Sequence, residues 1–158
     1  MLTQIVSLLQ KLKGFTKPKA PEKYPAELRP LIQRKVNTLL MTMKSIGMEV
    51  RVVEGVRTCA RQNELYNQGR TTRGIIVTNA KCGDSFHQYG VAVDFVFRKE
   101  GYKASAKQWE TLGKVGEELG FEWGNRWVNF PDKPHFQLTL GYSLKDFQND
   151  RVDYSKFQ

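Results

Sequence analysis

"SFHQYGVAVDF", residues 85–95, is the stretch that decides the fold of this chain. Residues 91–97 form an apolar run between Gly90 and Arg98, which is typical of a short buried strand. Asp94 interrupts that run. A carboxylate in an apolar strand loses its hydration, and this is costly unless a group of opposite charge faces it. The sequence therefore predicts a cationic partner for Asp94, either a side chain or a metal ion.

The composition describes one ordinary globular domain. The chain has 158 residues, of which 40% are hydrophobic and 26% are charged. A formal net charge of +9 favours polyanionic partners such as nucleic acid, anionic lipid or an anionic wall polymer. Because no recognition-helix, zinc-finger or aromatic RNA-binding signature accompanies the charge, we expect no nucleic-acid partner.

Residues 1–24 are predicted to lie outside the folded domain, which spans residues 25–158. Residues 1–13 can form a short helix with one apolar face, and a linker rich in Pro and Lys follows. Such a basic amphipathic segment either docks on the domain, frays in water or lies on a membrane surface. It lacks the basic start and small-residue cleavage site of a secretory signal.

Hydrophobic spacing and capping residues predict a mixture of helices and strands, hence an α+β fold. The expected elements besides the Asp94 strand are a helix from Ala26 to Gly47, a strand over residues 48–56, a helix capped by Thr58 and ended by Gly69, a helix from about Ser105 to Gly120, and a short strand over residues 135–140.

The chain contains only two histidines, and each lies near a carboxylate. His87 precedes Asp94 by seven residues, and His135 follows Asp132 by three. Two imidazoles and one carboxylate are a common ligand set of catalytic zinc, and Asp132 is then suited to act as a general base. The spacing is a weak pattern, so an ion pair between Asp94 and an arginine remains an equal alternative.

Four segments in the same order resemble a family of zinc peptidases that act on peptidoglycan. "DSFHQYGVAVDF" and "DKPHFQ" are similar to its SxHxxGxAxD and (D/E)xxH motifs. "EGVRTCARQNELYNQGRT" is similar to the segment that carries a substrate-side arginine, and "EWGNRW" resembles a WGxxW stretch. The family includes D-alanyl-D-alanine carboxypeptidases and dipeptidases and phage-type L-alanyl-D-glutamate endopeptidases. The resemblance covers about residues 50–140 and implies a small antiparallel sheet that carries a zinc site, flanked by helices, as in hedgehog and D-Ala-D-Ala peptidase-like folds.

The resemblance implies a role for each matched residue. His87, Asp94 and His135 match the Zn²⁺ ligands, and Asp132 matches the general base, which is Asp in phage-type members and Glu in dipeptidases. Arg57 matches the arginine that steadies the polarised carbonyl, a task that suits the fixed donors of a guanidinium. A structural ion pair is the alternative role for Arg57.

Substrate-binding residues are less well defined. Ser85 matches the motif serine, which either contacts substrate or caps the turn. Trp123 and Trp127, together with Phe130, either wall the cleft or belong to the core.

Two departures from the family pattern concern the surroundings of the site. Cys82 stands where relatives commonly have Pro, and we expect Cys82 and Cys59 to be free buried thiols rather than a pair. Asn125 and Arg126 replace a more usual Gly-Gly or Gly-Asp pair. Arg126 is expected to make the rim of the cleft more basic.

The resulting hypothesis is a monomeric zinc peptidase that cuts the peptide stem of peptidoglycan at L-Ala–D-Glu, as a phage-type endolysin. The alternatives are a D-alanyl-D-alanine carboxypeptidase and a wall-binding module without catalysis, against which the retained Asp132 argues. The positive charge is expected to attract an anionic wall polymer or a membrane surface. Such a protein is expected to be made in the cytoplasm and to reach the wall or periplasm through a pore.

Overall fold

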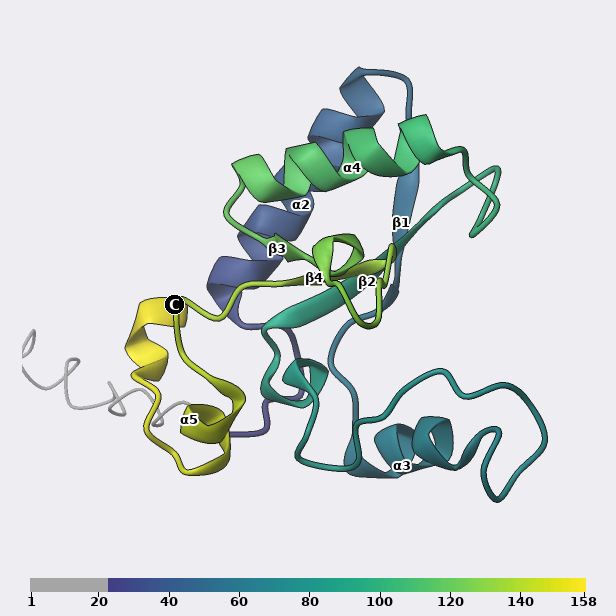
Figure 1. The fold of residues 1–158 in the computed structure, drawn as a ribbon. Helices are drawn as coiled ribbons and strands as arrows, with labels where there is room; N and C mark the ends of the chain where they lie inside the picture. The colour runs from purple at the N-terminus through teal and green to yellow at the C-terminus, as the bar shows by residue number, and fades with distance from the viewer. Residues whose placement is uncertain (1–22) are drawn as a thin grey trace, which may run out of the picture.

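The structure, a computed structural model, describes residues 23–158 as an antiparallel sheet flanked by helices (Figure 1). The expected helix over residues 1–13 lies outside these residues. The four strands have the order β1-β2-β4-β3, and every neighbouring pair is antiparallel. Their bounds are Val50–Glu54 for β1, Ala92–Phe97 for β2, Glu122–Trp123 for β3 and His135–Gln137 for β4. The predicted α+β class is confirmed.

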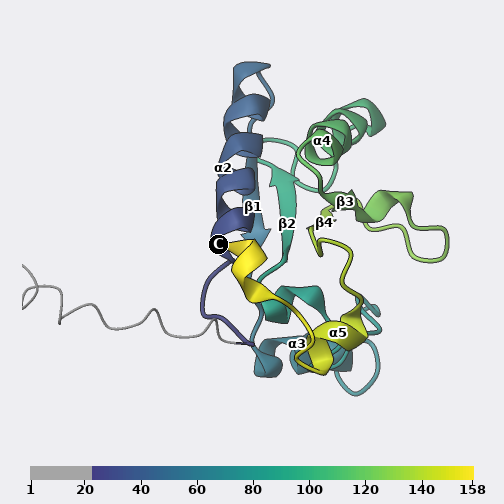
Figure 2. The same ribbon diagram turned by 90° about the vertical axis from the view of Figure 1, so that its left-hand side faces the viewer.

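Two helices pack together against the sheet, α2 (Pro30–Ser45) and α4 (Ala106–Glu118) (Figures 1 and 2). The helix α4 begins with the expected cap at Ser105, whose side chain accepts from the backbone of Gln108. The helix α2 begins at Pro30 and not at Ala26 as expected. A proline suits the first turn of a helix, and it keeps the residue before it in an extended conformation.

Two glycines of α4 allow the sheet to approach that helix closely. A Cβ atom on Gly113 would collide with the ring of Trp123, and one on Gly116 would collide with the ring of Phe136. The rings of Trp123 and Phe136 stack with their centroids 6.1 Å apart. The ends of β3 and β4 are thereby fixed against the helix, and β4 begins at His135.

The smaller elements were not expected from the sequence, except that α3 (Cys59–Asn67) lies where a helix capped by Thr58 was predicted. The others are η2 (Phe86–Tyr89), η3 (Gly124–Arg126), α5 (Leu144–Gln148) and η4 (Tyr154–Phe157). In Figure 1, α3 and α5 lie at the end of the sheet away from α4. Among residues 23–158, no helix has the length and apolar character required to span a bilayer.

Candidate active site

The register of the central strands brings the two histidines to Asp94. Asp94 in β2 lies opposite His135 in β4, and His87 lies in η2, just before β2. Gly90 joins η2 to β2 with a φ of 71°, a conformation that glycine adopts without strain. Asp94 Oδ1 lies 3.2 Å from His87 Nε2 and 3.2 Å from His135 Nδ1, and the two nitrogens are 3.2 Å apart.

The other ring nitrogen of each histidine faces an oxygen atom outside this cluster. His87 Nδ1 lies 2.8 Å from the carbonyl oxygen of Gly55, and His135 Nε2 lies 3.0 Å from Gln137 Oε1. If each of these nitrogens carries the proton, the opposite nitrogen of each ring keeps a lone pair for a metal ion. Two neutral imidazoles and a carboxylate, with ligand atoms within 4.8 Å of one another, are a donor set that suits zinc.

The pKa values of Asp94 and His135 are shifted from their ordinary values. Burial alone raises the pKa of Asp94, but hydrogen bonds from His135 and His87 outweigh it and hold that pKa well below its usual range. Burial lowers the pKa of His135, but Asp94 outweighs it and raises that pKa. The aspartate therefore stays ionised within the strand, which answers how an apolar run tolerates it.

Asp132 lies at the edge of the same cluster. It lines the cleft, and its backbone N–H donates to Gly124 O at 3.0 Å while its carbonyl accepts from His135 N at 3.3 Å. A Cβ atom on Gly124 would lie 2.7 Å from Asp132 O, so only glycine fits there. Burial raises the pKa of the Asp132 carboxyl, and the charge of His135 opposes this. Such a carboxylate is a good proton acceptor beside a metal centre.

Arg57 contacts the cluster from the other side. Its Nη2 lies 3.3 Å from Asp94 Oδ2, and its Nη1 donates to Gln62 Oε1 at 2.9 Å. Its backbone N–H donates to the carbonyl of His87 at 3.2 Å. The ion pair that was the alternative to a metal site is thus present, but it occupies one oxygen of Asp94 while the two histidines face the other.

The cluster opens into a cleft of about 820 Å³. Ser85, Trp127 and Phe130 line this cleft. Trp123 does not. It is 1% exposed, and its indole N–H donates to the carbonyl of Lys133, so the structure assigns it to the core and not to substrate binding.

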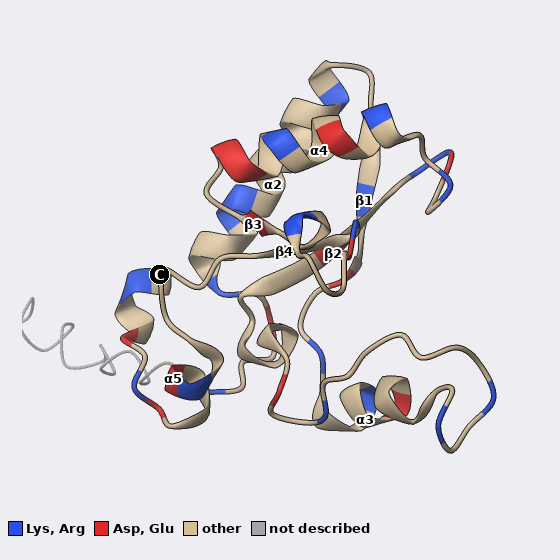
Figure 3. Cartoon of the chain, viewed as in Figure 1, with Lys and Arg blue, Asp and Glu red and all other residues tan. Residues whose placement is uncertain are grey.

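The expectation that Arg126 makes the cleft rim basic is wrong. Arg126 contacts Glu110 at 2.8 Å and Glu117 at 2.9 Å, both on α4, and its guanidinium lies over the ring of Trp123. Figure 3 shows Lys and Arg spread over the helices and loops rather than gathered in one place. Among the described residues, Arg57 and Arg61 are the basic side chains that line the cleft.

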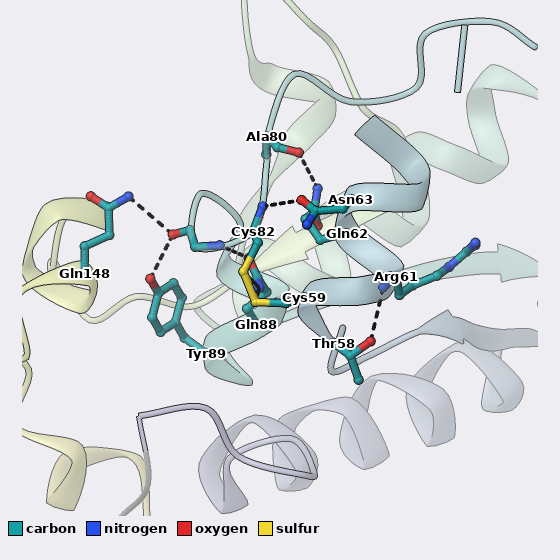
Figure 4. Close-up of a disulfide and its surroundings, with 11 residues drawn as sticks. Thr58, Cys59, Arg61, Gln62, Asn63, Ala80, Cys82, Gln88, Tyr89 and Gln148 are labelled. Atoms are coloured by element: carbon teal, nitrogen blue, oxygen red, sulfur yellow. Dashed lines mark hydrogen bonds between the residues drawn. A yellow bond between two sulfur atoms is a disulfide. The ribbon is translucent and has the colours of Figure 1, made fainter. Parts of the chain in front are cut away.

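Cys59 and Cys82 form a disulfide, so the expectation of free buried thiols is also wrong (Figure 4). Both cysteines are exposed. The bond joins the first residue of α3 to the segment that leads into η2. Their pairing depends on a tertiary contact between segments 23 positions apart, which no local pattern in the sequence reports.

Three residues that support the site were not singled out from the sequence, namely Gln62, Glu122 and Gln137. Gln62 is fully buried and contacts Arg57, whereas Gln137 and Glu122 contact each other beside His135. Gln137 did carry a signal. It is a polar residue in a buried strand, two positions after His135, and therefore on the same face. Nothing in the sequence around Gln62 or Glu122 distinguishes them from surface residues.

Comparison with known proteins agrees with this geometry. Residues 78–138 match a family model described as D-alanyl-D-alanine carboxypeptidase. The chain is 35% identical over 125 residues to the peptidoglycan L-alanyl-D-glutamate endopeptidase CwlK of Bacillus subtilis, which covers 72% of this chain and 75% of that protein. It is also 35% identical over 115 residues to the L-alanyl-D-glutamate peptidase of Listeria phage A118, covering 69% of this chain but 37% of the phage protein.

A solved structure shows the same fold. The L-Ala D-Glu endopeptidase ChiX of Serratia marcescens superposes with a TM-score of 0.52 at 24% identity, covering 84% of this chain and 96% of that one. The match to CwlK spans most of both chains. The segment that matches the family model, residues 78–138, includes His87, Asp94 and His135. The chain therefore belongs to the zinc peptidase family of D-alanyl-D-alanine carboxypeptidases and L-alanyl-D-glutamate endopeptidases.

Proposed function

We propose that this protein is a zinc-dependent endopeptidase that cuts the L-alanyl–D-glutamate bond of the peptidoglycan stem. The observation that carries the proposal is the convergence of His87, Asp94 and His135 on one point of an open cleft, with Asp132 and Arg57 beside it. The two relatives at 35% identity, both named for cleavage of this bond, support the choice of substrate.

His87 Nε2, His135 Nδ1 and the Asp94 carboxylate would hold the metal. Zinc, when bound, supplies a Lewis acid that polarises the scissile carbonyl and makes water nucleophilic near pH ~7. The remaining chemistry belongs to the chain. The acceptor behind each histidine keeps a proton on that side of the ring, so the metal would bind the opposite nitrogen, and Asp94 contributes the negative charge that the metal requires.

Asp132 acts as the general base in this proposal. It takes a proton from the attacking water and delivers it to the leaving amine, and its raised pKa suits both transfers. Arg57 donates to the carbonyl oxygen as negative charge develops there. Gln62 and Asp94 hold the Arg57 guanidinium in place, so its donors are oriented before substrate binds.

The charges of the cleft favour an endopeptidase over a carboxypeptidase. A carboxypeptidase recognises a terminal carboxylate and so needs a cation for it. Of the two described basic residues that line the cleft, Arg57 contacts Asp94, and Arg61 lies between Glu54 at 3.7 Å and Glu64 at 3.4 Å. Each is already paired with a carboxylate of the chain, which makes a dedicated site for a terminal carboxylate less favourable than a site for an internal bond.

Mass spectrometry of a digest of purified peptidoglycan tests the proposal. We expect stem peptides with a new N-terminal D-Glu, produced by the zinc-loaded protein and not by the protein treated with chelator. Loss of one terminal D-Ala, with the rest of the stem intact, would assign the carboxypeptidase activity instead. Binding to the wall without any cleavage would assign a non-catalytic wall-binding role.

We further propose that the protein acts in phage-type lysis and reaches the wall through a membrane pore, which the phage relative supports. Cells that express the protein should then stay intact until the inner membrane is permeabilised. Lysis on expression alone, in cells without a pore-forming protein, would contradict this route.

A further inference from the structure

The nitrogen of His135 that faces away from the proposed metal begins a chain of hydrogen bonds. Gln137 Oε1 accepts from His135 Nε2 at 3.0 Å, and Gln137 Nε2 donates to Glu122 Oε2 at 2.9 Å. The indole N–H of Trp127 donates to the other oxygen of Glu122. The chain therefore connects a proposed ligand with an aromatic side chain that lines the cleft.

Strand geometry explains why these residues meet. Gln137 follows His135 by two positions in β4, so both side chains lie on one face of the sheet. Glu122 is the partner of Gln137 in the β3–β4 pairing. Trp127 follows η3, and its ring centroid lies 5.1 Å from that of His135.

The donors and acceptors of the chain allow one arrangement. An ionised carboxylate only accepts hydrogen bonds, so Glu122 requires the NH₂ group of Gln137 to face it. The amide oxygen of Gln137 then faces His135 and accepts only if His135 Nε2 carries the proton. His135 Nδ1 faces Asp94 Oδ1 at 3.2 Å, so it can also carry a proton without metal, and its lone pair becomes available when a metal ion displaces that proton.

We propose that Gln137 and Glu122, anchored by Trp127, are positioning residues that fix the tautomer and orientation of His135 for metal binding. This rests on the proposed zinc site, but the proton on His135 Nε2 is a property of the metal-free protein as well. Outer partners of this kind commonly change metal affinity by ~10–100-fold when they are removed.

The test compares Gln137→Leu with the Glu122→Gln, Gln137→Glu double variant, in which the carboxylate and the amide are exchanged. Zinc affinity is measured by competition with a chromophoric chelator, and protonation of His135 Nε2 is measured by ¹⁵N NMR of the imidazoles without metal. Gln137→Leu should bind zinc ~10–100-fold more weakly and lose the fixed proton on Nε2. The exchanged pair keeps an acceptor for His135 and a donor between residues 122 and 137, and should restore both. Glu122→Ala, at an exposed position that tolerates truncation, should give a smaller loss in the same direction.

Equal zinc affinity and an unchanged tautomer in Gln137→Leu and Glu122→Ala would overturn the proposal. So would a wild-type, metal-free His135 that carries no proton on Nε2. If the wild-type protein has the Nε2–H tautomer but binds no zinc, the positioning chain stands and the proposed function fails, so the two outcomes are distinguishable.

The helix α3 forms part of the cleft wall but makes no hydrophobic contact with the core of the protein. Its only buried residue is Gln62, and none of its side chains belongs to the hydrophobic core or packs against that core. Leu65 of α3 lines the cleft, and so do Val77 and Ala80 of the loop that follows.

Polar contacts and one covalent bond hold this wall in place (Figure 4). Gln62 Nε2 donates to Ala80 O at 2.7 Å, and Asn63 Oδ1 accepts from Cys82 N at 3.0 Å. The Cys59–Cys82 disulfide joins α3 to the end of the loop. The Asn63–Cys82 contact is exposed, so water competes for it and its net contribution is small, whereas the contacts of Gln62 are buried. The disulfide is the covalent cross-link that holds the wall together with the buried contacts of Gln62.

We also infer that peptidase activity depends on the redox state of Cys59 and Cys82. Both are exposed, so a small thiol can exchange with the disulfide. Two thiols then form on the protein while two molecules of the small thiol are oxidised to a disulfide. Reduction frees α3, and because Gln62 of α3 holds the Arg57 guanidinium, Arg57 loses its position. Gln88 of η2 donates to both sulfurs, but the three metal ligands lie outside α3, so we expect the metal cluster to remain.

Comparison of oxidised protein with protein reduced by a phosphine tests this inference. Reduction should speed tryptic cleavage at Arg70, Arg73 and Lys81 in the loop, leave zinc content unchanged, and lower kcat/KM, approaching the ~100-fold that a ~1 Å misplacement costs. The Cys59→Ser, Cys82→Ser double variant should behave as the reduced protein with or without phosphine.

Equal tryptic cleavage and equal kcat/KM in the two states would overturn the redox inference, as would two alkylatable thiols in protein isolated under oxidising conditions. Because tryptic cleavage needs no peptidase activity from the protein, a failure of the proposed function is distinguishable from a failure of this inference.

Discussion

Asp94 shows how one residue links the fold to the chemistry. In the sequence it is an anomaly, a carboxylate inside a buried strand. In the structure one of its oxygens contacts both histidines and the other contacts Arg57. The strand that a carboxylate would otherwise destabilise is therefore the strand that presents the metal ligand.

Asp132 is the residue whose replacement separates binding from catalysis. Asp132→Asn keeps the size of the side chain and the backbone hydrogen bonds of residue 132 with Gly124 and His135. The amide, unlike the carboxylate, cannot act as a proton acceptor. We expect zinc content to stay at the wild-type level and turnover to fall ~100-fold or more, the scale of general-base catalysis. Elemental analysis and single-substrate kinetics measure the two effects.

The pH dependence of the turnover rate at saturating zinc, measured for the wild type and for Asp132→Asn, is the control for this assignment. Because burial raises the pKa of Asp132 above its ordinary value of 3.8, the wild-type rate should fall as the pH drops through that raised pKa. The variant should lack this acid limb. If Asp132→Asn lost zinc while Asp94→Asn retained it, the roles assigned to the two carboxylates would have to be exchanged.

At the scale of elements, close packing of α4 on the sheet fixes β4 and hence His135. Gly113→Ala should destabilise the protein by about 1–3 kcal/mol, because its Cβ atom would collide with the ring of Trp123. Gly55→Ala is the matched control, since its Cβ atom would meet Leu28 at an ordinary 3.6 Å. Urea unfolding measures both, and equal midpoints for the two variants would contradict this account of the packing.

Elements with local signals could be predicted from the sequence. The side chains of Thr58 and Ser105 cap α3 and α4 as expected, because capping depends on residues within one turn. The strand β3 has two residues and forms only because it pairs with β4, so it carries no pattern of its own. Trp123 and Trp127 are alike in sequence, and only tertiary packing places one in the core and the other in the cleft.

In the site, too, some residues have a local signal in the sequence and others depend on tertiary contacts. His87, Asp94, Asp132 and His135 lie in two short motifs and could be found from the sequence. The contacts that orient them could not, because Gln137, Glu122 and the Cys59–Cys82 bond act across strands and loops that are distant in the chain.

For the whole molecule, net charge affects how the protein finds its substrate. Lys and Arg of residues 23–158 are spread over helices and loops (Figure 3), and we expect the net charge of +9 to act as a general field around the protein. Lysis of isolated walls should therefore weaken between 0.1 M and 1 M salt, as the Debye length falls from ~10 Å to ~3 Å. Cleavage of a small soluble muropeptide should change little. Equal salt sensitivity of both substrates would place the effect in the active site.

The proposed chemistry depends on one metal ion bound between His87, Asp94 and His135 in the cleft. Anomalous diffraction at the zinc absorption edge, from crystals of the protein purified with zinc, tests it most directly. We predict one strong peak bonded to His87 Nε2, His135 Nδ1 and the Asp94 carboxylate at ~2.0–2.2 Å. Absence of a peak at these three residues, or a peak held by other side chains, would contradict the account.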